Sequence, residues 1–320
     1  MSMHFRDIAD HAAADGVITA EEILALRQAG WSDGRIRPDE AEALFAINDA
    51  VSDVSCEWSD FFVEAMGEFI VNTLEPKGYV TDEQGEWLVA RIDHDGKVDS
   101  LVELELLVRV FERATSVPQR LRDYALAQIE RAVLTGEGPT RCGGGLEKGN
   151  VTEAEAKLMR RIIFASGSDR PAGVSRAEAD MLYRIKDAAL DSANSPEWKR
   201  LFVQGVGNYL VGFADHTAVS RERAAELEAF MNDHRPSLGR FAARMAKSTV
   251  SGNFFDSIGY ALGMKDGDEG PSIDERVEAD RAVTTNEQMW LEGKIDGNDQ
   301  VDEYDQAVLD FLEEESGFTR

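Results

Sequence analysis

A short sequence motif recurs along this chain and predicts the start of one helix after another. It is a hydroxyl residue with Glu or Gln three positions later, standing behind an apolar residue. The hydroxyl caps the first free N–H groups of a helix, and the Glu or Gln side chain reaches back to the capping residue. The motif occurs at Thr19–Glu22, Thr81–Gln84, Thr152–Glu155, Ser175–Glu178 and Thr284–Glu287, with a weaker copy at Arg37–Glu40. Because strand patterns are nearly absent as well, we predict an all-α protein.

Blocks of the first half return in the second half with their spacing kept. Residues 40–50 match 178–188, residues 58–71 match 198–211, and residues 80–99 match 283–302. Self-similarity of this kind is typical of a duplicated structural unit. We therefore predict two related helical bundles, with an insertion in the second at about residues 232–280.

A glycine-rich stretch separates the two predicted bundles. Residues 135–149 read TGEGPTRCGGGLEKG, a composition that breaks helices and is common in linkers. The predicted organisation is a first bundle over residues 1–134, a linker over 135–149 and a second bundle over 150–320. An acidic helical hairpin ends the second bundle.

The charge balance narrows the class of partner. The 320 residues carry 61 Asp and Glu against 34 Lys and Arg, a net charge of -27. Such a field repels phosphate backbones, so we expect no nucleic acid and instead a partner protein with a basic surface, or cations. Cys56 and Cys142 form no motif pair, and neither a secretory signal nor a membrane span is evident. We expect a cytoplasmic protein; its partner and oligomeric state are left open.

Several acidic turns share features with the calcium loops of EF-hands, which need oxygen ligands at fixed positions and a Glu at the twelfth. None of the four frames is complete: His11 and Ala13, for example, fall where the frame around Gly16 needs ligands. Capping explains many of these carboxylates without a metal. Weak binding of a divalent cation, Ca²⁺ or Mg²⁺, is the alternative. The candidate ligands are Asp15, Glu22, Asp33, Glu40, Asp93, Asp95, Asp99, Glu103, Asp296, Asn298, Asp302 and Asp305.

Residues 12–22, AAADGVITAEE, resemble the opening of TerB-like domains, the helical modules of the tellurite-resistance protein TerB and of the N-terminal part of DjlA. The pattern of Asp-Gly, an aliphatic residue and Glu returns at residues 33–40. The resemblance covers about the first 50 residues, and the equivalent part of the second half lacks its Asp-Gly. The resemblance implies an all-α, non-enzymatic module linked to stress response or to membrane-proximal complexes. It also implies that Asp15, Glu22, Asp33 and Glu40 hold metal ions.

The sequence contains none of the catalytic motifs tested. Its five histidines show no paired metal-binding spacing, and no phosphate loop or nucleophile elbow is present. The recurrent aromatic residues Trp58, Phe61, Phe62, Trp198 and Phe202 are predicted to be core. We therefore expect a non-enzymatic binding or scaffold protein that responds to divalent cations. The alternatives are a low-affinity, EF-hand-like calcium-binding protein and a metal-dependent hydrolase built on clustered carboxylates around Asp93–Glu103.

Overall fold

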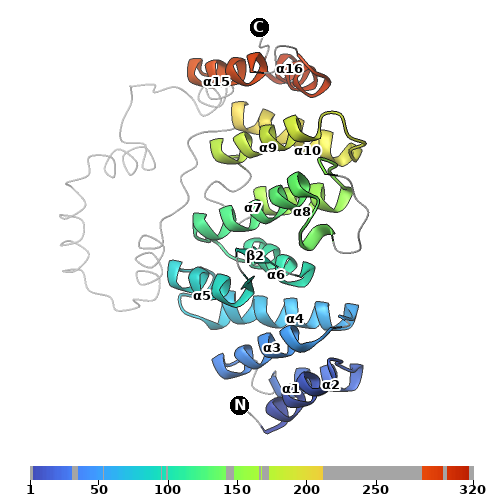
Figure 1. The fold of residues 1–320 in the computed structure, drawn as a ribbon. Coiled ribbons are helices and arrows are strands. Elements are labelled where there is room, and N and C mark those ends of the chain that lie inside the picture. Colours follow the sequence, from blue (N-terminus) through green and yellow to red (C-terminus); the bar gives the residue numbers. More distant parts are fainter. Residues whose placement is uncertain are drawn as a thin grey trace, which may run out of the picture. The chain divides into compact units, whose positions relative to one another are not determined.

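Helices account for nearly all the regular structure of the chain, as the computed structural model shows (Figure 1). It describes residues 3–30, 35–52, 54–94, 96–98, 100–141, 148–165, 167, 173–211, 283–297 and 301–316, without the side chains at positions 3, 4, 6, 12, 13, 15, 94, 315 and 316. The first half contains α1 (Met3–Asp15), α2 (Ala20–Gly30), α3 (Pro38–Ala50), α4 (Cys56–Glu68), α5 (Asp82–Ile92) and α6 (Leu101–Arg113). The second contains α7 (Gln119–Thr135), α8 (Glu153–Ile163), α9 (Arg176–Ala189), α10 (Pro196–Val211), α15 (Thr285–Asp296) and α16 (Glu303–Ser316).

Four short elements complete the described part of the chain. A π-helical turn, Phe69–Thr73, continues α4, and a 3₁₀ turn, Pro139–Arg141, follows α7. The two-residue strands β1 (Asp93–His94) and β2 (Lys97–Val98) pair antiparallel between α5 and α6. The prediction of an all-α fold is therefore confirmed.

The predicted capping motifs lie at the starts of helices. Thr81, Thr152, Ser175 and Thr284 each accept a hydrogen bond from the N–H three residues on, whose Gln or Glu side chain accepts one in return. Thr19 and Glu22 make the same exchange before α2, with distances of 3.2 and 2.9 Å. At α3 only half of it exists: Glu40 accepts from the Arg37 N–H at 3.0 Å, because an Arg side chain has no acceptor to offer.

The turn before α2 needs its glycine. Gly16 adopts a positive φ of 71°, a left-handed conformation that costs a residue with a Cβ more than it costs glycine. The Gly16 carbonyl accepts a hydrogen bond from the Ser52 N–H at 3.0 Å. The turn therefore ends α1 and fixes it against the end of α3.

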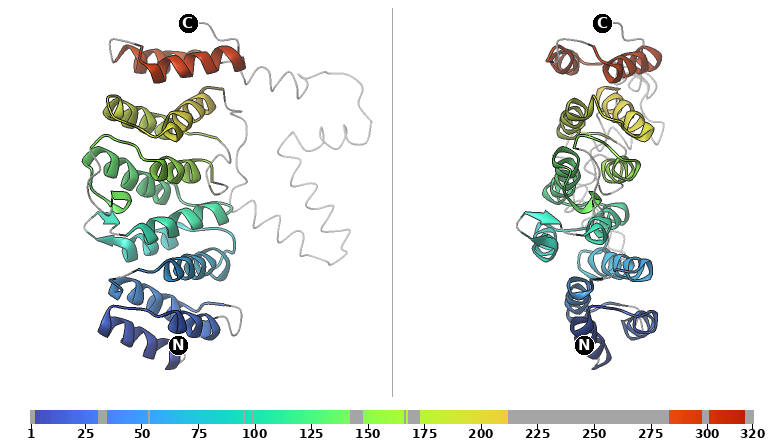
Figure 2. Two further views of the ribbon diagram at one scale, coloured as in Figure 1. Left: turned by 90° about the vertical axis from the view of Figure 1, so that its right-hand side faces the viewer. Right: turned by 45° about the vertical axis from the view of Figure 1, so that its right-hand side comes forward.

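The contacts between helices run in chain order (Figures 1 and 2). In the first half α1 packs on α2 and α3, α4 packs on α2 and α3, and α6 packs on α4. In the second half α7 packs on α8 and α9, α10 packs on α8 and α9, and α16 packs on α10. These matching contacts agree with the proposed relation between the halves, but the duplication itself stays a prediction.

The recurrent aromatic residues lie in the core, as predicted. Trp58, Phe61, Phe62, Trp198 and Phe202 are all fully buried. The glycines of α10 allow neighbouring side chains to approach its backbone closely. A Cβ at position 205 would meet Leu182 Cδ1 at 2.6 Å, and one at position 207 would overlap the ring of Phe311.

The described helices all belong to one compact unit, which comprises residues 1–218 and 281–320. The described helices of both predicted bundles therefore lie in this unit, where α6 contacts α8. α7 falls within the predicted first bundle of residues 1–134, but it packs on α8 and α9 as well as on α6. Arg161 of α8 pairs with Glu105 and Glu112 of α6, each at 2.7 Å. The linker boundaries at residues 135–149 stay a prediction, and the predicted insertion at about 232–280 lies outside the described residues.

Candidate functional site

The N-terminal candidate ligands serve as helix caps wherever the structure describes them. Glu22 accepts from the Thr19 backbone N–H and hydroxyl at 2.9 and 2.7 Å. Glu40 is buried and pairs with the Arg37 guanidinium at 2.7 Å. The side chain of Asp15 and all of Asp33 lie outside the described residues. The described carboxylates of this region therefore start α2 and α3.

The turn between α5 and α6 uses its two described carboxylates in different ways. Asp93 Oδ1 accepts from the Gly96 N–H at 2.6 Å, which closes the turn between β1 and β2. Burial, with the nearby Asp93 carboxylate, raises the pKa of the Tyr124 hydroxyl. Glu103 is buried and forms a capping box with Ser100, so it is the third residue of α6. Asp95 and Asp99 lie outside the described residues.

The last group of candidates surrounds a buried lysine. Lys186 of α9 is 0% exposed, and its Nζ lies 2.6 Å from Asp302 Oδ2 and 3.3 Å from Asp305 Oδ1. Asp302 also caps α16 by accepting from the N–H groups of Tyr304 and Asp305, at 2.8 and 3.0 Å. Asp296 is exposed at the end of α15, and Asn298 lies outside the described residues. We call Lys186, Asp302 and Asp305 the lysine cluster.

Opposing forces set the charges in the lysine cluster. Burial alone would lower the pKa of Lys186, but hydrogen bonds to Asp302 and Asp187 and the charge of Asp305 raise it above the ordinary value. Burial would raise the pKa of Asp302, but the hydrogen bond from Lys186 lowers it. For Asp305, burial dominates and raises the pKa. The cluster therefore contains a firmly charged ammonium group and a firmly ionised Asp302.

Lys186 supplies to Asp302 and Asp305 the positive charge that a metal ion would otherwise bring. Within the described ranges, no group of three or more His, Cys, Asp or Glu side chains is placed to hold a metal ion. Asp95, Asp99 and Asn298 fall outside those ranges, so the metal assignment of the acidic turns stays a prediction.

Lys186 was not among the residues predicted from the sequence to form a site, although the sequence contains a signal for its buried contact. Buried residues Leu182, Ile185 and Ala189 of α9 recur at helical spacing, and Lys186 lies among them. A lysine on an apolar face needs a buried partner of opposite charge. That requirement points to a charged contact, but it does not say that the partner lies more than a hundred residues away.

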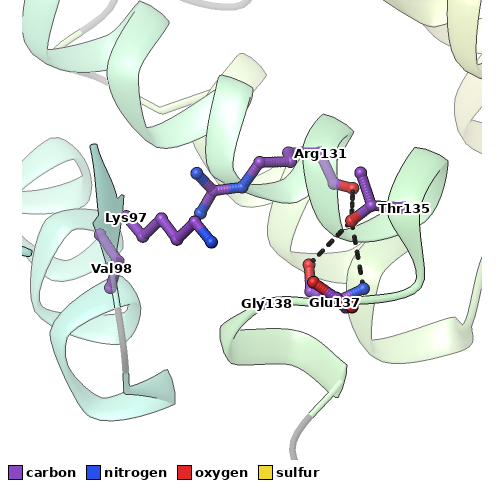
Figure 3. Close-up of a pocket in the computed structure, with 6 residues that line it drawn as sticks. All are labelled: Lys97, Val98, Arg131, Thr135, Glu137 and Gly138. Atoms are coloured by element: carbon purple, nitrogen blue, oxygen red, sulfur yellow. Dashed lines mark hydrogen bonds between the residues drawn. The ribbon is translucent and has the colours of Figure 1, made fainter. Parts of the chain in front are cut away.

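A polar cavity opens between β2 and the end of α7 (Figure 3). Its volume is about 300 Å³, and its lining residues are Lys97, Val98, Arg131, Thr135, Glu137 and Gly138. Figure 3 shows Lys97 and Arg131 reaching toward one another from β2 and α7, with Glu137 on the loop beyond Thr135. These side chains could not be singled out from the sequence, because exposed charges far apart in sequence form no motif.

The exposed surface of α16 is acidic. Asp310, Glu313 and Glu314 are exposed, and α16 contains no basic residue over its whole length. Asp310 accepts a hydrogen bond from Gln306 at 2.7 Å. Glu313 and Glu314 lie in the last turn, where the negative end of the helix dipole disfavours carboxylates. Helix capping therefore does not explain these residues.

No protein-family model, curated protein or solved structure matches this chain. No helix in the described part of the chain is long and apolar enough to cross a membrane.

Proposed function

We propose that this protein is a non-enzymatic binding or scaffold protein, and that α16 contacts a basic surface of a partner protein. The observation that carries the proposal is the exposed group of Asp310, Glu313 and Glu314 on a helix without basic residues. We call these three residues the acidic end of α16.

The placement of the acidic end favours a role in binding over a role in folding. Carboxylates in the last turn of a helix cost stability, typically about 0.3–1 kcal/mol each at an exposed site. A basic partner would remove that cost, and the net charge of -27 would speed its approach. Buried Glu103, Glu155 and Glu178, by contrast, have partners inside the protein and start helices.

The TerB-like pattern in residues 12–22 supports the same class of function, because that family is non-enzymatic and linked to stress response. The proposal includes a response to a divalent cation. The residues proposed for it are Asp93 and Asp296, which the structure describes and which lie at the two turns richest in acidic residues. Calorimetric titration with calcium tests that part, with Asp93→Ala and Asp296→Ala as comparisons. Heat of binding that both substitutions leave unchanged would remove these turns from the proposal.

The main test compares two variants of equal net charge. One carries Asp310→Asn, Glu313→Gln and Glu314→Gln; the other carries Asp10→Asn, Asp60→Asn and Glu86→Gln, at exposed positions on three other helices. The probe is a fluorescent decalysine peptide, titrated by anisotropy at low and high salt. We expect the wild type and the dispersed variant to bind it in a salt-sensitive manner, and the α16 variant to bind it several-fold more weakly. Equal binding by both variants would show that the field of the whole protein, rather than α16, holds the peptide.

A further inference from the structure

The cavity of Figure 3 has a positive side held in place by neutral partners. Arg131 Nη1 donates to the Gly96 carbonyl at 2.9 Å, and Arg131 Nη2 donates to Gln128 Oε1 at 2.7 Å. Gln128 Oε1 also accepts from the Val98 N–H at 3.3 Å. The guanidinium is therefore oriented by a carbonyl and an amide, and it keeps N–H groups for a further acceptor.

Lys97 adds a second positive charge to this side. It is exposed, and within the described residues no carboxylate pairs with it or with Arg131. The chain has nearly twice as many acidic as basic residues, and basic residues elsewhere, such as Arg91, Arg113 and Arg184, find a carboxylate. Lys97 and Arg131 therefore place two positive charges on this side of the cavity.

The other side of the cavity is negative. Glu137 is exposed and lines the cavity. It follows the end of α7, where the helix dipole is negative. Thr135 holds the loop, because its hydroxyl donates to the Arg131 carbonyl at 2.8 Å and accepts from the Glu137 N–H at 3.2 Å. The backbone that carries Glu137 is thus tied to the helix that carries Arg131.

We infer that this cavity binds a small zwitterion of the amino-acid class. Its carboxylate would lie between Lys97 and the free N–H groups of Arg131, and its ammonium group would face Glu137. A simple anion would meet the Glu137 carboxylate, and a simple cation would meet two positive charges. Only a ligand with both charges matches both sides of the cavity. This inference does not depend on the acidic end of α16.

The test uses L-glutamine as the zwitterion and its two half-ligands, acetate and methylammonium. Backbone amide shifts of Gly96 and Gly138 in ¹⁵N-labelled full-length protein report binding at the two sides of the cavity. We expect glutamine to bind about three- to fivefold more tightly than acetate, the gain of one exposed ion pair. Methylammonium is expected to bind more weakly than glutamine. Acetate binding as strong as that of glutamine, or no titratable shift with any probe, would overturn the inference.

Two exposed substitutions separate the roles of the two sides. Lys97→Met should weaken the binding of both glutamine and acetate. Glu137→Gln should leave acetate binding intact or improve it, and remove the advantage of glutamine. A glutamine advantage that survives Glu137→Gln would show that the ammonium group is not recognised there, and the inference would fail. Unchanged shifts at amides outside the cavity confirm that both variants keep the fold.

Discussion

Two helix contacts, α3 with α6 and α9 with α16, each contain a buried polar residue. The two residues differ in charge. The match between residues 40–50 and 178–188 places Asn48 and Lys186 at corresponding positions. Asn48 donates to Glu103 of α6 at 3.3 Å and accepts from the Trp58 indole at 3.3 Å. Lys186 instead binds the carboxylates of Asp302, the residue before α16, and of Asp305 in α16. The first half uses a neutral amide where the second half uses a buried charge.

The connections that lead to these two contacts differ in length. In the first half only residues 69–81 separate α4 from α5, so the chain itself limits how α5 and α6 can pack. In the second half residues 212–284 separate α10 from α15. The closure cost of a loop grows slowly with its length, but a long connection fixes no register. The lysine cluster favours one register, because Lys186 and Asp305 are both fully buried and each compensates the charge of the other.

Removing the buried charge of Lys186 should have the largest effect on this comparison. Lys186→Met leaves Asp305 buried without its cation, and we expect a loss of about 3–5 kcal/mol in the free energy of unfolding. Asn48→Leu should cost about 1–3 kcal/mol, because it leaves the Trp58 indole and Glu103 without one neutral partner. Urea titrations followed by circular dichroism measure both values.

A double variant controls for the change in packing. Lys186→Met with Asp305→Leu removes both fully buried charges, and we expect it to recover a large part of the lost stability. If Lys186→Met costs no more than Asn48→Leu, the buried charge has no special role in holding α16.

The two core tryptophans should respond unequally to loss of their indole N–H. Trp58 donates to Asn48, whereas Trp198 Nε1 is buried and has no acceptor among the described residues. Both substitutions to Phe lose buried ring area, but only Trp58→Phe also breaks a hydrogen bond. We expect Trp58→Phe to cost about 1 kcal/mol more than Trp198→Phe in the same urea titration. Equal costs would argue against the bond between Trp58 and Asn48.

The stability contributed by Lys186 should depend on pH with a defined sign. Its pKa is raised in the folded protein, so its contribution is complete below the unfolded value of about 10.4 and is lost as the pH rises through the folded value. The difference in stability between the wild type and Lys186→Met should therefore narrow at alkaline pH. At acid pH the contribution of Asp302, whose pKa is lowered, is lost as the pH falls through its folded value. An unchanging difference across the alkaline range would contradict this account.

The stability lost at a helix cap should depend on how deeply the cap is buried. Thr152→Ala removes the cap of α8. Glu155, the partner of Thr152 in the capping box, is buried, and its Oε1 lies 2.8 Å from Arg141 Nε. Thr19→Ala removes the more exposed cap of α2. Thermal unfolding should show losses of about 1–2 kcal/mol for the first and about 0.5 kcal/mol for the second. The reverse order would mean that burial does not strengthen these caps.

The start of each helix could be predicted from sequence because a cap is a local arrangement. Thr81 and Gln84, three residues apart, contain all the information that their box requires. The burial of Trp58 and Trp198 followed from helical spacing in the same local way. Glu103 was harder, because a carboxylate in an acidic turn suits a cap and a metal equally until its bond to Ser100 is seen.

Contacts between distant segments could not be predicted in this way. Lys186 and Asp305 are 119 positions apart, and no periodicity joins them. The same holds for the cavity, where Lys97 and Arg131 come together only because the turn after β1 packs beside α7. Local rules therefore predicted the helices, whereas the sites that depend on packing between helices required the structure.

The long stretch between α10 and α15 has a consequence for the nascent chain on the ribosome. Trp198 and Phe202 are synthesised about a hundred residues before Tyr304 and Val308 of α16, which are buried in the same core. At a translation rate of about 5–20 residues per second, that interval lasts roughly 5–20 s. During that interval, part of the apolar surface of α9 and α10 is not yet covered by α15 and α16. A chaperone that shields aromatic side chains could bind there.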